Sequence, residues 1–306
     1  MSCKAITTKK TPCSRKATIN GYCKAHYNLL KVPAALAEME EPVVAEHDGY
    51  KSPSEDRHTI LSLPELDLTL LAVFDGHGSS YISNTVNSIL PQRIFDKVKV
   101  LPIPEPHLIV QILIREFEEV NRQLRRRVED GGSTGTVSVI TPTHVITANV
   151  GDSPALIFDR ANTLLETTVD HDCDNPLQQA RMRLAGNMCV PGKRRIVSGL
   201  APTRNFGDFI HKGVMATPQT YVWPRTPGVI LCVCSDSFSE EIRQDPKLHI
   251  GPYQTREGMV RELNESINTS ATLKEAAPKA VLKRVEKFNI DGKYYGDNTT
   301  LILMEL

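Results

Sequence analysis

The sequence lacks the features that define several classes of protein. Its 306 residues hold no apolar run approaching the roughly 20 residues of a membrane-spanning helix. Residues 1–10 are polar and no apolar segment follows them, so we expect neither a signal peptide nor a membrane association. An excess of basic charge is also missing, because 36 Lys and Arg balance 36 Asp and Glu. This balance excludes a protein whose whole surface binds polyanions, although it leaves a local basic patch open.

The sequence also lacks the cysteine pattern of a protein held together by disulfides. The seven cysteines are an odd number, and a chain of this length needs no disulfides to hold its core. We therefore predict a reducing, cytoplasmic environment, in which Cys173, Cys189, Cys232 and Cys234 are ordinary buried or loop residues. Hydrophobic residues make up 40% and charged residues 24%, which is typical of a folded globular protein.

The composition changes near residue 45. Residues 1–45 form a basic segment with three of the cysteines, and residues 32–46, rich in Pro, Ala and Glu, predict a short helix and a linker. No internal repeat or low-complexity tract interrupts residues 46–306, so we predict a single domain there.

Two kinds of pattern alternate in that domain. Short apolar or β-branched runs bounded by Gly, Pro, Asp or Asn predict strands at 68–74, 137–141, 145–150, 155–158, 229–234 and 299–304. Apolar residues that recur at three and four positions predict helices at 106–128, 82–98 and, less regularly, 263–285. Because strand follows strand, residues 137–158 predict a hairpin or meander. Antiparallel pairing favours an α+β fold over a doubly wound parallel sheet.

Several acidic residues fall at the ends of predicted strands. Asp75 follows the run 68–74, Asp236 follows 229–234, and Asp297 precedes 299–304. Glu55 and Asp56 lie ahead of another apolar stretch. Each alone would be a turn or cap residue. Converging carboxylates repel one another, however, and a hard divalent cation with oxygen ligands would neutralise them.

A histidine accompanies the first of these acids. His77 lies between Gly76 and Gly78, on a loop that could approach a ligand closely. A histidine there could bind a metal or transfer a proton, and the alternative is an ordinary surface histidine.

Together these motifs resemble the metal-dependent Ser/Thr protein phosphatases of type 2C. The segment Asp75-Gly76-His77-Gly78 after an apolar strand is similar to the signature of that family. Similar segments follow in the same order, over about residues 49–306. They are Gly132-Ser133-Thr134-Gly135-Thr136, Ala148-Asn149-Val150-Gly151-Asp152-Ser153, Asp170-His171, Ala185-Gly186, residues 200–208 ending in Phe206-Gly207-Asp208, Ser235-Asp236 and Asp297-Asn298-Thr299.

The resemblance implies a four-layer αββα sandwich, with two antiparallel sheets flanked by helices and a metal centre in a cleft at one edge. By that resemblance, Asp75 would bridge two Mg²⁺ or Mn²⁺ ions, and the Gly76 carbonyl would bind one of them. Asp236 and Asp297 would bind the other ion.

The resemblance also implies the remaining roles and the reaction. Glu55 and Asp56 would act mainly through metal-bound waters, and Asp152 with Glu240 would hold a weaker third ion. His77 would be the general acid that protonates the leaving oxygen. The implied reaction is hydrolysis of phosphoserine or phosphothreonine in protein substrates by a water that two metal ions activate.

Some positions depart from the family pattern. Lys51 stands where the family usually has a phosphate-binding Arg, so the charge is kept but the bidentate geometry is lost. Ser237 stands where Gly usually follows the aspartate, and its Cβ could shift the loop that carries Asp236. The alternative hypothesis is therefore a pseudophosphatase, which would use the same fold to bind and regulate a partner without hydrolysis.

Two basic segments complete the predictions. Cys3, Cys13, Cys23 and His26 could supply a tetrahedral zinc site, although gaps of nine residues are longer than usual. This segment resembles short Cys/His segments in proteins of large DNA viruses, which would make the compartment that of a host cell, and its lysines could contact nucleic acid. The alternative is a flexible tail with incidental cysteines. Lys193-Arg194-Arg195 could steer acidic or phosphorylated substrates. We expect a monomer.

Overall fold

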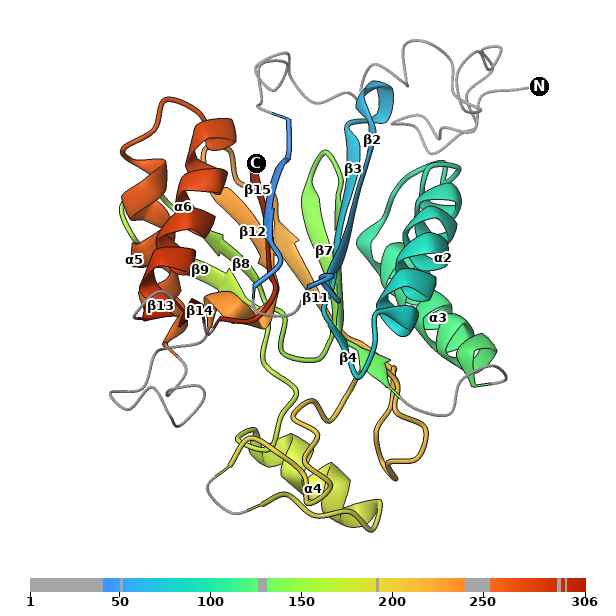
Figure 1. The fold of residues 1–306 in the computed structure, drawn as a ribbon. Coiled ribbons are helices and arrows are strands. Elements are labelled where there is room, and N and C mark those ends of the chain that lie inside the picture. Colours follow the sequence, from blue (N-terminus) through green and yellow to red (C-terminus); the bar gives the residue numbers. More distant parts are fainter. Residues whose placement is uncertain are drawn as a thin grey trace, which may run out of the picture.

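Two five-stranded antiparallel sheets lie face to face in a computed structural model of the protein, and a pair of helices covers the outer side of each (Figure 1). The structure describes residues 41–49, 52–125, 131–190, 193–239, 254–290, 293–294 and 296–306. The predicted α+β sandwich is confirmed. Within the described residues, no helix is both long and apolar enough to span a membrane.

Each sheet is assembled from strands that are distant in sequence. The first has the order β11-β7-β6-β3-β2 and the second the order β1-β15-β12-β8-β9. In the first sheet the strands are β2 (Arg57–Leu63), β3 (Leu68–Phe74), β6 (Gly135–Ile140), β7 (His144–Val150) and β11 (Gln219–Pro224). In the second they are β1 (Val43–His47), β8 (Ala155–Phe158), β9 (Leu164–Thr167), β12 (Ile230–Cys234) and β15 (Thr299–Glu305).

Four long helices form the outer layers. Helices α2 (Tyr81–Val98) and α3 (Pro106–Leu124) pack on the first sheet, and α5 (Arg256–Ile267) and α6 (Leu273–Lys287) pack on the second. Shorter elements complete the described structure. They are the 3-10 turns η2 (Pro64–Leu66) and η3 (Asp236–Phe238), a small sheet of β4 (Gly76–His77), β5 (Gly132–Ser133) and β10 (Phe206–Gly207), and the pair β13 (Asn289–Ile290) and β14 (Lys293–Tyr294).

Strand β3 shows why a central strand can be apolar on both of its faces. Leu70 and Phe74 on one face pack with α2 and α3, whereas Leu71 and Val73 on the other face belong to the core between the sheets. Side chains of a strand alternate between its faces, and here both faces are buried. The run 68–74 therefore has no regular alternation of polar and apolar residues, and Asp75 is the first polar residue after its carboxyl end.

A separate segment projects from one end of the sandwich. We call residues 168–218, between β9 and β11, the flap; its one α-helix in the described residues is α4 (Pro176–Leu184) (Figure 1). A small cluster of its own, with Cys173, Met182 and Ile196 buried, supports it.

Most predicted elements are confirmed and two predictions are wrong. The helix predicted at 263–285 is two helices, because Thr272 caps a new helix by accepting the Glu275 N–H. The hairpin predicted within residues 137–158 is confirmed by β6 and β7, and β8 then crosses to the second sheet. Residues 43–46, expected in a helix and linker, belong to strand β1. The division of the chain near residue 45 stays a prediction.

Candidate metal centre

Asp75 is held from behind by two of the other motifs. Its N–H donates to Thr134 Oγ1 at 3.1 Å, and its carbonyl accepts the Thr134 N–H at 2.9 Å. Thr134 Oγ1 also lies 2.7 Å from Ser153 Oγ. The Gly-Ser-Thr segment and the Gly-Asp-Ser turn therefore meet at the end of β3, where they fix the backbone of the aspartate.

Asp56 lies deep in the same region. It is 3% exposed, and its Oδ2 accepts the Thr300 hydroxyl at 2.9 Å. Its Oδ1 is buried and has no hydrogen-bond partner among the described residues. A buried acceptor without a partner costs about 1–3 kcal/mol. An oxygen in that state is suited to a cation or to a water that a cation holds.

Asp236 and Asp297 come from neighbouring strands of the second sheet. Asp236 begins η3 directly after β12, and Asp297 precedes β15, which pairs with β12. The Ser235 N–H donates to the Thr300 carbonyl at 3.0 Å, so the two strand ends are tied together. Asn298 donates its N–H to Asp297 Oδ1 at 2.7 Å, and this orients the carboxylate.

Glu55 is placed through its backbone. Its N–H donates to Asn298 Oδ1 at 2.8 Å, and its carbonyl accepts the Ser83 hydroxyl at 2.6 Å. Gly76 lies against this carbonyl, since a Cβ at that position would stand 2.7 Å from both the Glu55 oxygen and Ser83 Oγ. Glycine is therefore required at residue 76 for β3, Glu55 and helix α2 to meet.

The carboxylates are close enough to perturb one another. Burial, and then the charges of Asp56, Asp236, Asp297 and Asp152, raise the pKa of Asp75 well above its usual value. Burial is also the main cause that raises the pKa of Asp56, Asp152 and Asp236 to about 6. Mutual repulsion of this kind is relieved by a divalent cation with oxygen ligands.

The acidic side chains lie in one region, but they do not have the geometry of a metal-binding site. Within the described residues, no three His, Cys, Asp or Glu side chains stand in a geometry that could hold a metal as they are. The buried or half-buried acids at the ends of β2, β3, β7, β12 and β15, together with the unpartnered Asp56 oxygen, nevertheless fit a group of divalent cations. The donors are all oxygens, which favours Mg²⁺ or Mn²⁺ over zinc.

His77 is paired with an aspartate that the strand-end pattern did not single out. His77 Nε2 lies 2.6 Å from Oδ2 of Asp208, a residue that is only 3% exposed. Asn205 Nδ2 donates to the same oxygen at 2.6 Å. A Cβ at Gly132 would stand 2.4 Å from Asp208 Oδ2 and 2.5 Å from His77 Nε2, so a glycine makes room for the pair. The available signal was Phe206-Gly207-Asp208 in the family resemblance.

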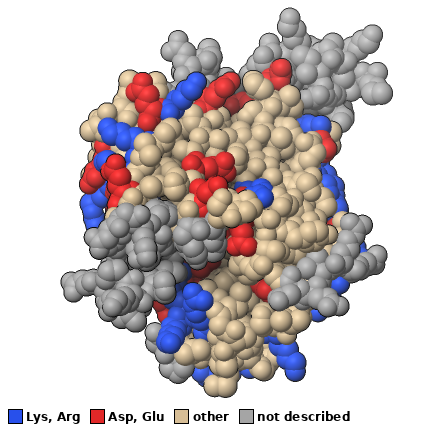
Figure 2. All heavy atoms as spheres, viewed as in Figure 1, with Lys and Arg blue, Asp and Glu red and all other residues tan. Residues whose placement is uncertain are grey.

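Asp152 faces the flap as well as the other acids. Arg194 of the flap reaches to within 4.0 Å of its carboxylate. Within the run 193–195, Arg194 is turned onto acidic side chains, whereas Lys193 and Arg195 are exposed, and the role of this run in steering substrates stays a prediction. In the view of Figure 2, basic and acidic side chains are interspersed and neither forms a continuous patch on the described surface.

Two other predictions concern cysteines and undescribed residues. Cys173 and Cys189 form a disulfide, with sulfur atoms 2.09 Å apart, so the expectation that they are ordinary thiols is wrong. They lie on either side of α4, where the fold of the flap brings them together. Lys51, Glu240 and the zinc candidates Cys3, Cys13, Cys23 and His26 lie outside the described residues.

Known families match two parts of the chain. The model described as "Protein phosphatase 2C" matches residues 41–233, and a "Domain of unknown function (DUF5763)" matches residues 1–32. The resemblance of the amino-terminal segment to viral proteins stays a prediction.

Curated relatives are similar over part of their length. The chain is 34% identical over 176 residues to a human "Probable protein phosphatase 1N", which covers 56% of this chain and 40% of that protein. It is 25% identical over 243 residues to "Protein phosphatase 2C 7" of Arabidopsis thaliana, which covers 70% and 44%. The chain thus spans less than half the length of these relatives.

Solved structures share the fold. A serine-threonine phosphatase 2C from Toxoplasma gondii superposes with a TM-score of 0.66 at 17% identity, over 90% of this chain and 96% of that one. A C. elegans sex determining protein gives a TM-score of 0.70 at 19% identity, over 87% and 64%. At these identities the likeness concerns the fold.

Proposed function

This chain belongs to the protein phosphatase 2C family, and from that premise we propose that it hydrolyses phosphoserine and phosphothreonine in proteins, in a reaction that depends on two Mg²⁺ or Mn²⁺ ions. The observation that carries the proposal is the convergence of acidic side chains from distant segments around Asp75, beside the His77–Asp208 pair. Structural acids are rarely gathered in this way without a cation.

The chain's own residues would divide the work between holding ions and moving a proton. Asp75, the Gly76 carbonyl, Asp236 and Asp297 would hold the two ions directly, and Glu55 and Asp56 would hold their waters. When bound, such ions offset the charge of the phosphate and lower the pKa of a coordinated water. Lys51 would contribute a positive charge for the phosphate oxygens.

His77 would deliver the proton to the serine or threonine oxygen that leaves. Because Nε2 is hydrogen-bonded to Asp208, the proton would come from Nδ1. The buried carboxylate would hold the ring in one orientation, as a second partner commonly does for a catalytic histidine.

The test is hydrolysis of p-nitrophenyl phosphate by the full chain with added Mn²⁺. We expect activity in the wild type and its loss in Asp75→Asn and Asp297→Asn, while Glu166→Gln, which alters an exposed acid of β9, keeps it. If all four proteins are inert but the wild type binds Mn²⁺, the pseudophosphatase hypothesis replaces this one. If none binds Mn²⁺, both the metal centre and the reaction are refuted.

A further inference from the structure

An arginine of the flap reaches into the acidic region from the side of Asp152. Its side chain is 14% exposed, and its guanidinium forms ion pairs with Asp172 through Nε and with Asp170 through Nη2, the latter at 2.9 Å. Asp152 Oδ2 lies 4.0 Å from the same Nη2. Asp152 and Asp172 are each about 4% exposed or less. This residue, Arg194, therefore carries a fixed positive charge among three buried or half-buried carboxylates.

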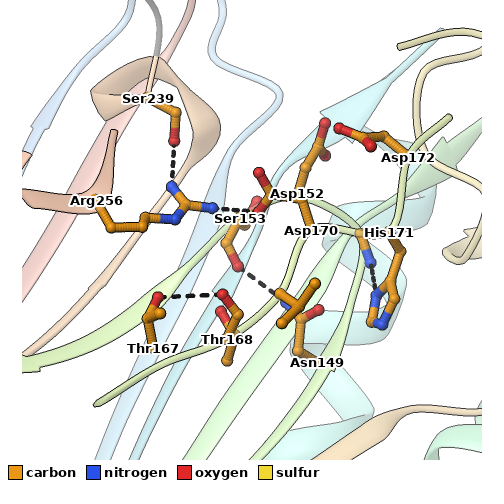
Figure 3. A network of polar contacts seen from close by, with 12 residues as sticks. Asn149, Asp152, Ser153, Thr167, Thr168, Asp170, His171, Asp172, Ser239 and Arg256 are labelled. Carbon is orange, nitrogen blue, oxygen red and sulfur yellow. Dashed lines mark hydrogen bonds and ion pairs between the residues drawn. The ribbon is translucent and has the colours of Figure 1, made fainter. Parts of the chain in front are cut away.

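A second arginine completes the group. Arg256 of α5 pairs with the other oxygen of Asp170 and donates to Ser239 Oγ at 2.7 Å. Figure 3 shows Arg256 between Ser239 and Asp170, with Asp152 and Asp172 beside them. Two guanidinium groups thus face three carboxylates, so most of the charge is balanced within the protein.

These contacts leave few oxygens for a metal. Both oxygens of Asp170 are bound to arginines. Asp172 Oδ2 is bound to Arg194, and its Oδ1 accepts the backbone N–H groups of Asp174 at 2.9 Å and Asn175 at 3.3 Å. A cation on this side of Asp152 would lack the ligands that Mg²⁺ or Mn²⁺ needs and would be repelled by the guanidinium.

The flap holds Arg194 in this place through its backbone. The Arg194 carbonyl accepts the Cys173 N–H at 3.2 Å, and the Cys173–Cys189 disulfide joins the two sides of the flap at that point. Cys189 also pairs with Ile196, which is buried in the flap's own cluster. Because the segment is fixed independently of any ligand, the guanidinium is already in position when metal ions arrive.

We propose that Arg194 takes the place of the third divalent ion beside Asp152, so that this chain binds two ions rather than three. The inference rests on the proposed function, because it assumes a two-ion centre at Asp75, Asp236 and Asp297. In this centre Arg194 is a positioning residue. Its guanidinium supplies, from the chain itself, the positive charge that an exchangeable third ion would otherwise supply. A lysine would keep the charge, but its single nitrogen could not replace the two separate nitrogens, Nε and Nη2, that bind Asp172 and Asp170.

The test counts Mn²⁺ ions bound to the full chain, from the electron paramagnetic resonance signal that free Mn²⁺ gives and bound Mn²⁺ loses. We expect two ions for the wild type and two for Asp152→Asn. Arg194→Gln, which frees carboxylate oxygens of Asp170 and Asp172, should bind one more ion. Arg194→Gln combined with Asp152→Asn should return to two.

A matched control and the opposing results separate the hypotheses. Arg195→Gln alters the neighbouring arginine, which is exposed and bonded to the Gly199 carbonyl, and should leave the count at two. The inference is overturned if the wild type binds a third ion that Asp152→Asn removes, or if folded Arg194→Gln still binds two. If Arg194→Gln does not fold by circular dichroism, the comparison of wild type with Asp152→Asn decides. A count that Asp75→Asn leaves unchanged would instead contradict the two-ion centre, and with it the proposed function.

Discussion

Replacing Asp208 by Asn would remove a charge from beside His77 while changing the shape of the site little. The Asn oxygen can take the place of Asp208 Oδ2, where it still accepts from Asn205. Residue 208 has a φ of 48°, and Asn tolerates this left-handed region better than most residues. We therefore expect the variant to fold, with a weaker hold on the imidazole ring.

The size of the effect follows from the pair itself. His77 Nε2 and Asp208 Oδ2 are 2.6 Å apart, and the carboxylate is 3% exposed, so solvent screens the interaction little. A hydrogen bond to a charged group contributes about 1.5–3 kcal/mol. Since about 1.4 kcal/mol of barrier corresponds to a factor of ten in rate, kcat should fall about 10–100-fold where His77 must donate a proton.

Two substrates distinguish this role from a loss of structure. A phosphothreonine peptide releases an alkoxide that needs a proton, whereas p-nitrophenyl phosphate releases a stable anion that does not. Asp208→Asn should therefore lose activity toward the peptide and change less than about threefold toward p-nitrophenyl phosphate. Equal losses on both substrates, or full activity toward the peptide, would refute the reasoning. Asp174→Asn, which alters an exposed acid of the flap, serves as the matched control.

Two further predictions concern stability. Burial, and next the charge of Asp297, raise the pKa of Asp56 and Asp236 without metal to about 6, above their value in the unfolded chain. The metal-free protein should therefore lose stability as pH rises from about 4 to about 7. Its Tm in EDTA should be lower at about pH 7.5 than at about pH 5, and Mn²⁺ should reverse the loss. Arg284 is 1% exposed and holds the turn after Asp236, because it donates to the carbonyl of Ser237 through Nε at 2.9 Å and through Nη2 at 2.5 Å. Arg284→Met should lower the free energy of unfolding by about 3 kcal/mol in urea titrations and raise the Mn²⁺ concentration needed for half activity.

Controls accompany both stability measurements. A Tm that is the same at both pH values in EDTA, or a Tm at high pH that Mn²⁺ does not raise, would contradict the electrostatic account of the acidic region. Lys287→Met is matched to Arg284→Met, because both side chains pair with Glu262, Arg284 at 3.1 Å and Lys287 at 3.4 Å, but the Lys287 side chain is 37% exposed. That variant should change stability by less than about 1 kcal/mol. Equal effects of the two substitutions would show that burial of Arg284 does not matter.

The local sequence pattern was sufficient to predict strands that are almost fully buried. The strands at 68–74 and 155–158 match β3 and β8 as predicted, because a short apolar run bounded by polar residues has few other uses. The pattern was insufficient for edge strands such as β11, whose residues are mostly half-buried or exposed. It also joined α5 and α6, which cover one sheet, although the polar segment 268–272 and the Thr272 cap separate the two helices.

Residue order by itself determined which acids end which strands, that glycines flank His77, and that the motifs resemble one phosphatase family. Each of these depends on neighbours in the chain. Tertiary structure alone decided that Asp208 lies against His77 across 131 positions, that Cys173 and Cys189 pair, and that Arg194 faces Asp152. Such contacts arise where the flap folds back on the sandwich, and a charge or a thiol has no local pattern that reveals which distant partner the packed layers will bring beside it.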